Sequence, residues 1–420
     1  MEDIRQIHLF DGARMLHYRT DRFKSTRITI RFALPAQEQH ASALAAVPGL
    51  IRYTAKQYPT TMQMERKLAS LYGAGFSGVS TIVGDAHVLS FTISTVADRF
   101  ALAGEVISRE CLQFLLACIF EPDLDENGLF KAENLQREQR LLIEDIQAVQ
   151  SDKMAYSVQR FQEIFYAGEG AAVPANGTEQ QVKALTADSV TAAWKNMLEK
   201  AEIFVLTVGD TDAQSIAETV RAAFQKTQRN YEKPVIAKHL KSTQLKQFHE
   251  EEPLEQCKLN MGFCVDCENE HVFKVMNMIF GRSEMSKLSK VVREKMSLCY
   301  YCSSVCALKK QTLMVFSGIE SQNREKTVAA VRAQLEEMQS GNITDEEIAI
   351  AKRKLKDAYL SSLDTPVDIA QWYLPQMFDE TILCVEESIA KMEAVTKEEI
   401  VACAQTAVLD TLYSLGKEQS

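Results

Sequence analysis

Arg293 and Tyr300 are the two residues whose types and spacing most directly suggest chemistry on a peptide. They bound the stretch 293–300, which reads Arg-Glu-Lys-Met-Ser-Leu-Cys-Tyr. A guanidinium and a phenol can polarise a peptide carbonyl or stabilise an oxyanion. In isolation, such a pair is more often structural, with the arginine in a surface ion pair and the tyrosine packed on a strand.

A hydrolytic zinc site is not visible in the sequence. Catalytic zinc needs three protein ligands and an open position for water, and no His-x-x-Glu-His sequence occurs at any register. No two of the seven histidines have i, i+4 spacing; they are His8, His17, His40, His87, His239, His249 and His271. The nearest imitation, His249-Glu250-Glu251, precedes Pro253, and we interpret it as a solvated charged loop.

Two cysteine pairs have the formal spacing of a structural zinc ribbon. They are Cys264-x-x-Cys267 and Cys299-x-x-Cys302, with Cys306 nearby. Both pairs fall in segments with strand character, where residues i and i+3 face opposite sides, and knuckle glycines are missing around them. We therefore expect ordinary half-buried thiols, with a structural zinc site as the less favoured alternative.

Composition excludes several classes of protein. The chain has 420 residues, enough for two domains of about 200 residues each. Hydrophobic residues make up 46% and charged residues 25%, as in globular proteins. The formal net charge of −10 argues against nucleic acid or an anionic membrane as the main partner. No membrane-spanning run and no signal peptide are visible, so we expect a cytoplasmic protein with its ten cysteines reduced.

Hydrophobic periodicity indicates an α+β order in the first half. We expect a hairpin over 11–34, helices over 41–53 and 60–72, and a strand over 79–95. Two helices follow, 100–120 and a long amphipathic one over 129–165. A short helix over 192–198 and a closing strand over 203–208 complete this half.

The second half repeats this order. Strands are expected over 258–267, 299–306, 312–319 and 409–415, and helices over 272–280, 286–295 and 326–338. Capping boxes at Thr344 and Thr396 open two more helices. The polar segment 225–245 has no clear period and is interpreted as a linker. The repeated order suggests a duplication, although alternation alone is also compatible with a doubly wound βαβ fold.

The stretch Arg-Glu-Lys-x-x-Leu-x-Tyr at 293–300 resembles a signature in the C-terminal halves of M16 (insulinase and pitrilysin-like) zinc peptidases. The resemblance extends through both halves. It implies two homologous domains of the LuxS/MPP-like metallohydrolase type, each a mainly antiparallel sheet covered by helices. We place these domains at 1–228 and 246–420, joined by a linker at 229–245. In active members, the residues matching Arg293 and Tyr300 contact the substrate backbone near the zinc.

The same resemblance implies that the zinc site of the first domain has been lost. Leu44, Val47 and Pro48 lie where the family carries histidine, glutamate and the second histidine. Glu144 matches the third ligand and is the one remaining carboxylate. Leucine and valine side chains offer no lone pair, so this chain is expected to hold no catalytic zinc.

The subfamily that this sequence resembles most is the bacterial YmfF-like group, sometimes labelled as associated with elongation factor P modification. Its members lack the metal motif and are typically paired with a subunit that keeps it. The resemblance therefore implies a non-catalytic subunit of a heterodimeric peptidase. The active partner would carry His-x-x-Glu-His and supply zinc, the nucleophilic water and the general base. The expected substrate is an unfolded peptide, without nucleic acid and without membrane insertion.

Two alternatives remain open. One is a peptide-binding or scaffold protein with no proteolytic role, as in the core subunits of a respiratory complex that share the fold. The other, less favoured, is a stand-alone metallopeptidase with unconventional ligands.

Overall fold

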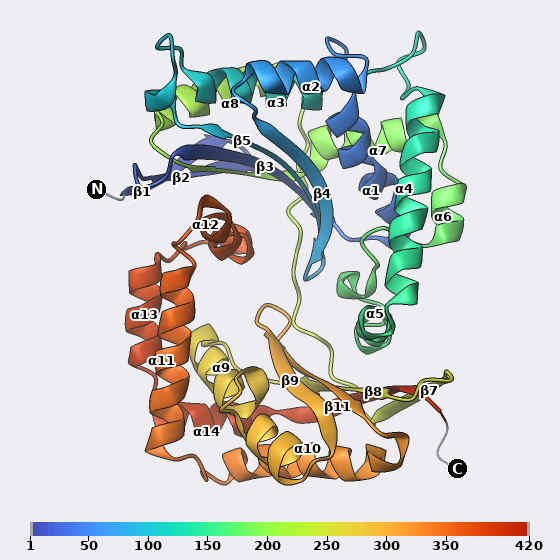
Figure 1. The fold of residues 1–420 in the computed structure, drawn as a ribbon, viewed down its shortest axis with the longest axis vertical. Coiled ribbons are helices and arrows are strands. Elements are labelled where there is room, and N and C mark those ends of the chain that lie inside the picture. The colour runs from blue at the N-terminus through green and yellow to red at the C-terminus, as the bar shows by residue number, and fades with distance from the viewer. Residues whose placement is uncertain (1–2, 418–420) are drawn as a thin grey trace. The chain divides into compact units, whose positions relative to one another are not determined.

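The computed structural model describes residues 3–417 and contains two compact units (Figure 1). Unit 1 comprises the described part of Met1–Ala148 together with Val173–Val235 and Ser362–Ile382. Unit 2 comprises Val149–Ala172, Ile236–Ser361 and the described part of Leu383–Ser420. Along residues 3–417, no helix combines the length and apolar character needed to cross a lipid bilayer.

Unit 1 is a sheet covered by helices. Its strands are β1 (Asp3–Phe10), β2 (Ala13–Arg19), β3 (Ser25–Pro35), β4 (Gly75–Val83), β5 (Ala86–Val96) and β6 (Glu202–Val208). Its helices are α1 (Glu38–Tyr53), α2 (Thr61–Ser70), α3 (Ile107–Phe120), α4 (Ala132–Ser151, whose last residues count with unit 2), α6 (Glu179–Lys183), α7 (Ala187–Lys200), α8 (Ala213–Phe224) and α12 (Pro366–Tyr373).

Unit 2 has the same kind of architecture. Its strands are β7 (Lys246–Glu251), β8 (Cys257–Cys264), β9 (Cys299–Ala307), β10 (Thr312–Ile319) and β11 (Val408–Gly416). Its helices are α5 (Lys153–Phe165), α9 (Glu270–Asn277), α10 (Arg324–Gln339), α11 (Asp345–Ser361), α13 (Val385–Glu393) and α14 (Lys397–Thr406), with π-helical segments η3 (Met278–Arg282) and η4 (Leu288–Lys295).

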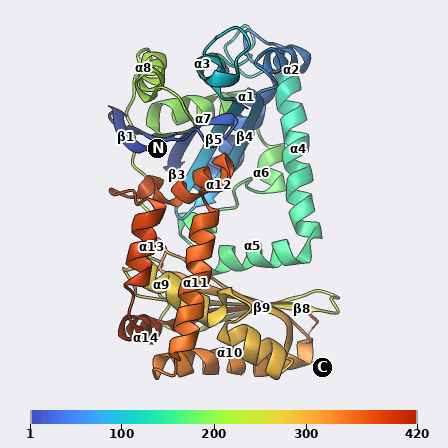
Figure 2. The same cartoon turned by 60° about the vertical axis from the view of Figure 1, so that its left-hand side comes forward.

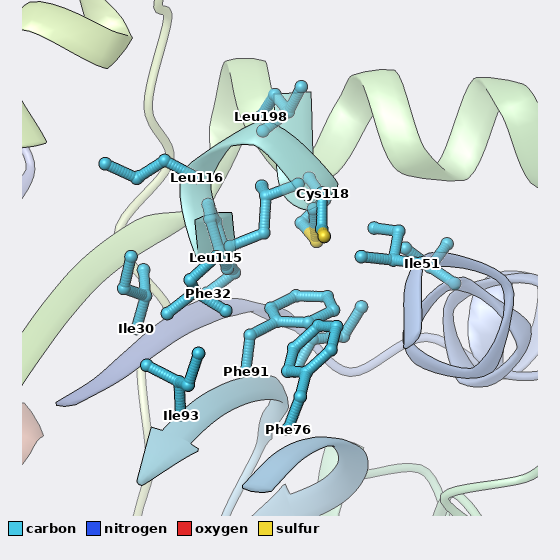
Figure 3. Packing of buried hydrophobic residues seen from close by; sticks show 14 of the residues in the cluster. Ile30, Phe32, Ile51, Phe76, Phe91, Ile93, Leu115, Leu116, Cys118 and Leu198 are labelled. Carbon is cyan, nitrogen blue, oxygen red and sulfur yellow. The ribbon is translucent and has the colours of Figure 1, made fainter. Parts of the chain in front are cut away.

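The core of unit 1 lies between its sheet and the helices α1 and α3. Alternate residues of β3 face one side, as the period of two in a strand requires. Phe32 on β3 meets Phe91 on β5 edge to face, with 5.8 Å between ring centroids. Leu115 and Cys118 of α3 are fully buried in the same cluster (Figure 3). This packing fixes the position of α1, the helix on which the family's zinc motif is expected.

The two sheets share one topology. Sheet order is β1-β2-β6-β3-β5-β4 in unit 1 and β7-β11-β8-β10-β9 in unit 2. In each, one neighbouring pair is parallel (β2 with β6, β7 with β11), and the next three pairs are antiparallel. Five strands therefore correspond one to one, and β1 is an addition. The α+β fold class with two helix-covered, mainly antiparallel sheets is confirmed.

Each unit also contains a helix from the other half of the chain. Helix α5, which follows α4 in the first half, packs on β8 and β11 of unit 2. Helix α12, from the second half, packs on β3 and β6 of unit 1. Because β3 corresponds to β8 and β6 to β11, the two helices cover equivalent strands. The expected domains 1–228 and 246–420 differ from the compact units in these two segments, whereas 225–245 contains no helix or strand, as expected of a linker.

Several expected elements were wrong in detail. The helix expected over 129–165 is two helices (Figure 2), because the Asp152 side chain accepts hydrogen bonds from the Met154 and Ala155 backbone N–H groups and starts α5. The strand expected over 79–95 is the hairpin β4–β5, turned at Gly84 with φ of +57°. Helix α1 begins at Glu38, earlier than the expected residue 41, and continues through Pro48. The expected loop at His249 is the strand β7, where His249 Nδ1 lies 2.9 Å from Ser414 Oγ.

Candidate functional site

Helix α1 presents hydrocarbon where the family carries metal ligands. Leu44 and Val47 are 2% and 0% exposed, and Pro48 is also buried. The Leu44 and Val47 side chains pack into the core of unit 1, and none of the three side chains has a lone pair to offer a metal ion. The histidine of this helix, His40, lies exposed in its first turn. A shift of register by one or two residues brings no ligand into this position.

Glu138 on α4 is the carboxylate that faces α1. A Cβ atom added to Gly49 would lie 2.0 Å from Glu138 Oε1, so the absence of a side chain at Gly49 makes room for the carboxylate. Glu138 is 5% exposed, and its Oε2 has no hydrogen-bond partner among the described residues. Burial raises the pKa of Glu138 to about 7, while neighbouring Arg137 and Arg52 lower it in part.

Glu144, the expected residual ligand, points elsewhere. Its side chain is 55% exposed and forms an i, i+4 ion pair with Arg140 at 3.2 Å. Glu144 lies six positions after Glu138. At about 100° per residue this is roughly 600°, or 240° beyond a full turn, so the two carboxylates lie on different faces of α4. Glu138, rather than Glu144, is therefore the α4 carboxylate that faces α1. The sequence signal that distinguishes the two is the apolar phase of α4, since Leu135 and Leu142 are buried with Glu138.

Strand β4 is an edge strand that lies against α1. A Cβ atom added to Gly78 would lie 2.9 Å from the Pro48 carbonyl oxygen, so glycine allows the close approach. Val79 next to it is 51% exposed. Ser80 Oγ lies 2.5 Å from Nε2 of the fully buried His87. Burial lowers the pKa of His87 to about 4. An edge strand of this kind beside α1 is suited to pairing with an extended peptide.

Arg293 and Tyr300 lie on unit 2, and both side chains are exposed. Arg293 belongs to η4, and Tyr300 is 59% exposed on β9, the edge strand that corresponds to β4. Within residues 3–417, the structure shows no ion pair for Arg293 and no side-chain hydrogen bond for Tyr300. This placement disfavours the structural interpretation, which required an ion pair and a packed ring.

A β-bulge sets the direction of Tyr300. Cys299 pairs with Ile319 and Tyr301 pairs with Gly318, so Tyr300 is the extra residue of β9. A bulge re-aims a side chain and reverses the alternation of faces beyond it. For that reason Cys299 and Cys302 lie on the same side of the strand, where their thiols are hydrogen-bonded. The expectation that residues i and i+3 face opposite sides was wrong at this pair.

The four cysteines cannot form one zinc ribbon. Along β10, Cys264 pairs with Thr312, and Cys299 pairs with Ile319 at the other end of the strand. Seven residues of strand correspond to roughly 23 Å, far beyond the span of a zinc site. Cys267 lies beyond the end of β8 and is hydrogen-bonded to Cys403 instead.

Comparison with known proteins agrees with this description. Residues 184–355 match the family described as the peptidase M16 inactive domain. The chain is 28% identical over 401 residues to the "Probable inactive metalloprotease YmfF" of Bacillus subtilis (strain 168), covering 94% of each. It superimposes with a TM-score of 0.90 on a conserved protein from Enterococcus faecalis V583, 27% identical over 99% of both chains.

A peptidase M16 inactive domain from Pseudomonas fluorescens shares the fold over 100% of this chain and 99% of its own, with a TM-score of 0.81 and 18% identity. The sheets, the hydrocarbon at Leu44 and Val47, and the similarity to proteins described as inactive lead to one assignment. The chain is similar to M16-type peptidase proteins described as inactive, and it lacks the His-x-x-Glu-His motif.

Proposed function

We propose that this chain is the non-catalytic subunit of a heterodimeric M16-type zinc peptidase. In this role it forms half of a peptide chamber and contributes Arg293 and Tyr300 to the active site of its partner. The partner supplies the catalytic zinc, the nucleophilic water and the general-base glutamate, and this chain supplies none of the three. The observation that carries the proposal is that Arg293 and Tyr300 are exposed, with no side-chain ion pair or hydrogen bond to the described residues. Separately, helix α1 of unit 1 offers no metal ligand at Leu44, Val47 and Pro48.

The two residues suit a role on a peptide carbonyl. The Arg293 guanidinium carries a fixed positive charge and five donors, and the Tyr300 hydroxyl adds one more. Donors aimed at a developing oxyanion stabilise the transition state more than the ground state. Because a bulge turns Tyr300 away from the regular alternation of β9, its hydroxyl is available to a ligand.

Copurification tests this proposal. The tagged chain, isolated from its own cells, is expected to bring down a similar-sized subunit bearing His-x-x-Glu-His. Peptide hydrolysis by that pair should fall roughly 100-fold in Arg293→Ala or Tyr300→Ala, the size of effect seen when one oxyanion donor is removed. The matched control is Met296→Ala, since Met296 is 47% exposed in the same segment.

Two results would contradict the shared active site. One is elution of the chain only with itself, and the other is peptide hydrolysis by both alanine variants at the rate of the control. Either result would favour the second candidate function, peptide binding without hydrolysis, which the edge strand β4 supports independently of any partner.

Binding of peptide to an edge strand has a specific signature. A peptide selected from a random library for binding to the purified chain is expected to pair through every second backbone amide. N-methylation of the amides that face the strand should abolish binding, and methylation of the alternate amides should leave the Kd nearly unchanged. Calorimetry on the two methylated series measures the difference. Equal loss in both series would rule out strand addition.

A further inference from the structure

Three potential metal ligands from distant parts of the chain converge in unit 2. His239 lies in the segment before β7, Cys264 ends β8, and Asp410 belongs to β11. Ligand atoms of the three side chains all lie within 4.8 Å of one another. The imidazole of His239 and the carboxylate of Asp410 are 2% and 0% exposed.

The imidazole of His239 is held with one nitrogen unused. Its Nδ1 lies 2.5 Å from Glu169 Oε1, and its ring packs on Phe165 at 4.5 Å between centroids. In the neutral ring, donation from Nδ1 to Glu169 leaves the lone pair on Nε2. That Nε2 is buried without a hydrogen-bond partner among the described residues, and its distance to Asp410 Oδ1 is 3.9 Å.

The surroundings of these side chains are already organised. Lys310, 3% exposed, pairs with Glu169 at 2.6 Å, and the His239 backbone N–H donates to the Lys310 carbonyl at 2.9 Å. The Ser242 backbone N–H donates to Asp410 Oδ2 at 2.6 Å. A carboxylate that fixes the tautomer of a ligating histidine is the usual outer partner in metal sites. Here Glu169 occupies that position.

We propose that His239 Nε2, Cys264 Sγ and an Asp410 carboxylate oxygen form a binding site for a divalent transition-metal ion, with Zn²⁺ as the ion that fits best. A nitrogen, a sulfur and an oxygen ligand match the donor preferences of zinc, whereas Mg²⁺ and Ca²⁺ prefer oxygen alone. Three ligands leave a fourth, tetrahedral position for water.

The geometry requires only a small adjustment. In a tetrahedral site with bonds of about 2.0 Å, nitrogen and oxygen ligands lie roughly 3.3 Å apart. The observed distance between His239 Nε2 and Asp410 Oδ1 is 3.9 Å, so ion binding requires the two atoms to approach by about 0.6 Å. Asp410 Oδ1 also accepts a hydrogen bond from Thr411 Oγ1 at 2.6 Å. Cys264 binds as a thiolate and releases its proton to solvent. Burial and the charge of Asp410 raise the pKa of free Cys264 to about 12, so the metal ion must displace that proton.

We assign the site a role in stability that is separate from the peptide-binding role. It ties the segment 236–245, which has no helix or strand, to the ends of β8 and β11. Binding an ion only in the folded state stabilises that state by mass action. We therefore expect zinc to raise the melting temperature of the full chain whether or not a partner subunit is present.

Metal binding to the purified full chain tests the proposal. After chelation and removal of the chelator, titration with Zn²⁺ should give one ion per chain and a higher melting temperature. Substitution with Co²⁺ should add a thiolate-to-cobalt charge-transfer band in the near ultraviolet. Cys264→Ser should remove that band, and Asp410→Asn should weaken binding by more than the 10–100-fold expected of Glu169→Gln.

Cys267→Ser is the matched control. Cys267 is three residues from Cys264 and is hydrogen-bonded to Cys403, outside the cluster. Its substitution should leave stoichiometry and the cobalt band unchanged. The proposal is overturned if folded wild-type chain binds no Zn²⁺ at micromolar concentrations, or if Cys264→Ser binds zinc as tightly as Cys267→Ser. Circular dichroism verifies that each variant is folded before titration.

Discussion

Replacing Glu138 by glutamine is expected to stabilise the protein at pH 8 by about 3 kcal/mol and to leave it nearly unchanged at pH 4.5. The folded-state pKa of Glu138 is raised to about 7 by burial, against an ordinary value of 4.5. Each pKa unit corresponds to about 1.4 kcal/mol. The favourable contribution of the protonated group is fully present below pH 4.5 and is lost as pH rises through 7. Glutamine does not ionise, so the variant keeps its stability as pH rises through 7.

Denaturant unfolding of wild type and Glu138→Gln at several pH values measures this effect. Glu144→Gln is the control, because Glu144 lies on the same helix but is 55% exposed. Comparison with wild type is necessary since His87 acts in the opposite direction. Burial lowers the pKa of His87 to about 4, so its contribution is present above pH 6.5 and is lost as pH falls. Parallel profiles for Glu138→Gln and wild type would refute the prediction.

Replacing Phe165 by alanine is expected to destabilise unit 2 by about 3–5 kcal/mol, the cost of removing a buried aromatic ring. Phe165 on α5 is 0% exposed and stacks on Phe161 with 5.4 Å between centroids. A Cβ atom added to Gly262 of β8 would lie 2.8 Å from the Phe165 ring, so the helix and the strand are closely packed. We therefore expect the loss of stability in unit 2, although Phe165 comes from the first half of the sequence.

The two units can be monitored separately. Both tryptophans of the chain, Trp194 and Trp372, belong to unit 1, so their fluorescence follows that unit. Hydrogen exchange in β8 and β11 follows unit 2. Phe165→Ala should accelerate exchange in those strands, and Met154→Ala, with Met154 48% exposed on the same helix, should not. A shift in the tryptophan transition without faster exchange in β8 would mean that α5 stabilises unit 1 instead.

Sequence reasoning located most elements and the missing zinc ligands. The strands over 203–208 and 312–319 correspond to β6 and β10, because long apolar runs bounded by polar residues specify a buried strand. The loss of the metal motif was visible because it depends on residue types alone. The sequence shows that Leu44 and Val47 cannot bind zinc, but it does not show which residues they contact.

Features that depend on long-range pairing could not be predicted. The spacing of apolar residues in α4 identifies its buried face. It does not show that Glu138 on this face meets Gly49 of α1. The bulge at Tyr300 exists only in register with β10. His239, Cys264 and Asp410 are far apart in sequence and meet only when three segments pack together. Likewise, the apolar positions of α5 predict an amphipathic helix without indicating which sheet it covers.

The exchange of α5 and α12 between the two halves has a consequence for synthesis on the ribosome. Strands β3 and β6 are made early, but α12, which packs on them, spans Pro366–Tyr373 and is made only after β7 to β10 of unit 2. Domains usually fold in order as the chain appears. Here part of the first sheet stays uncovered until most of unit 2 has been synthesised. A chaperone that shields this surface would therefore assist biogenesis, and neither half expressed alone would have a complete core.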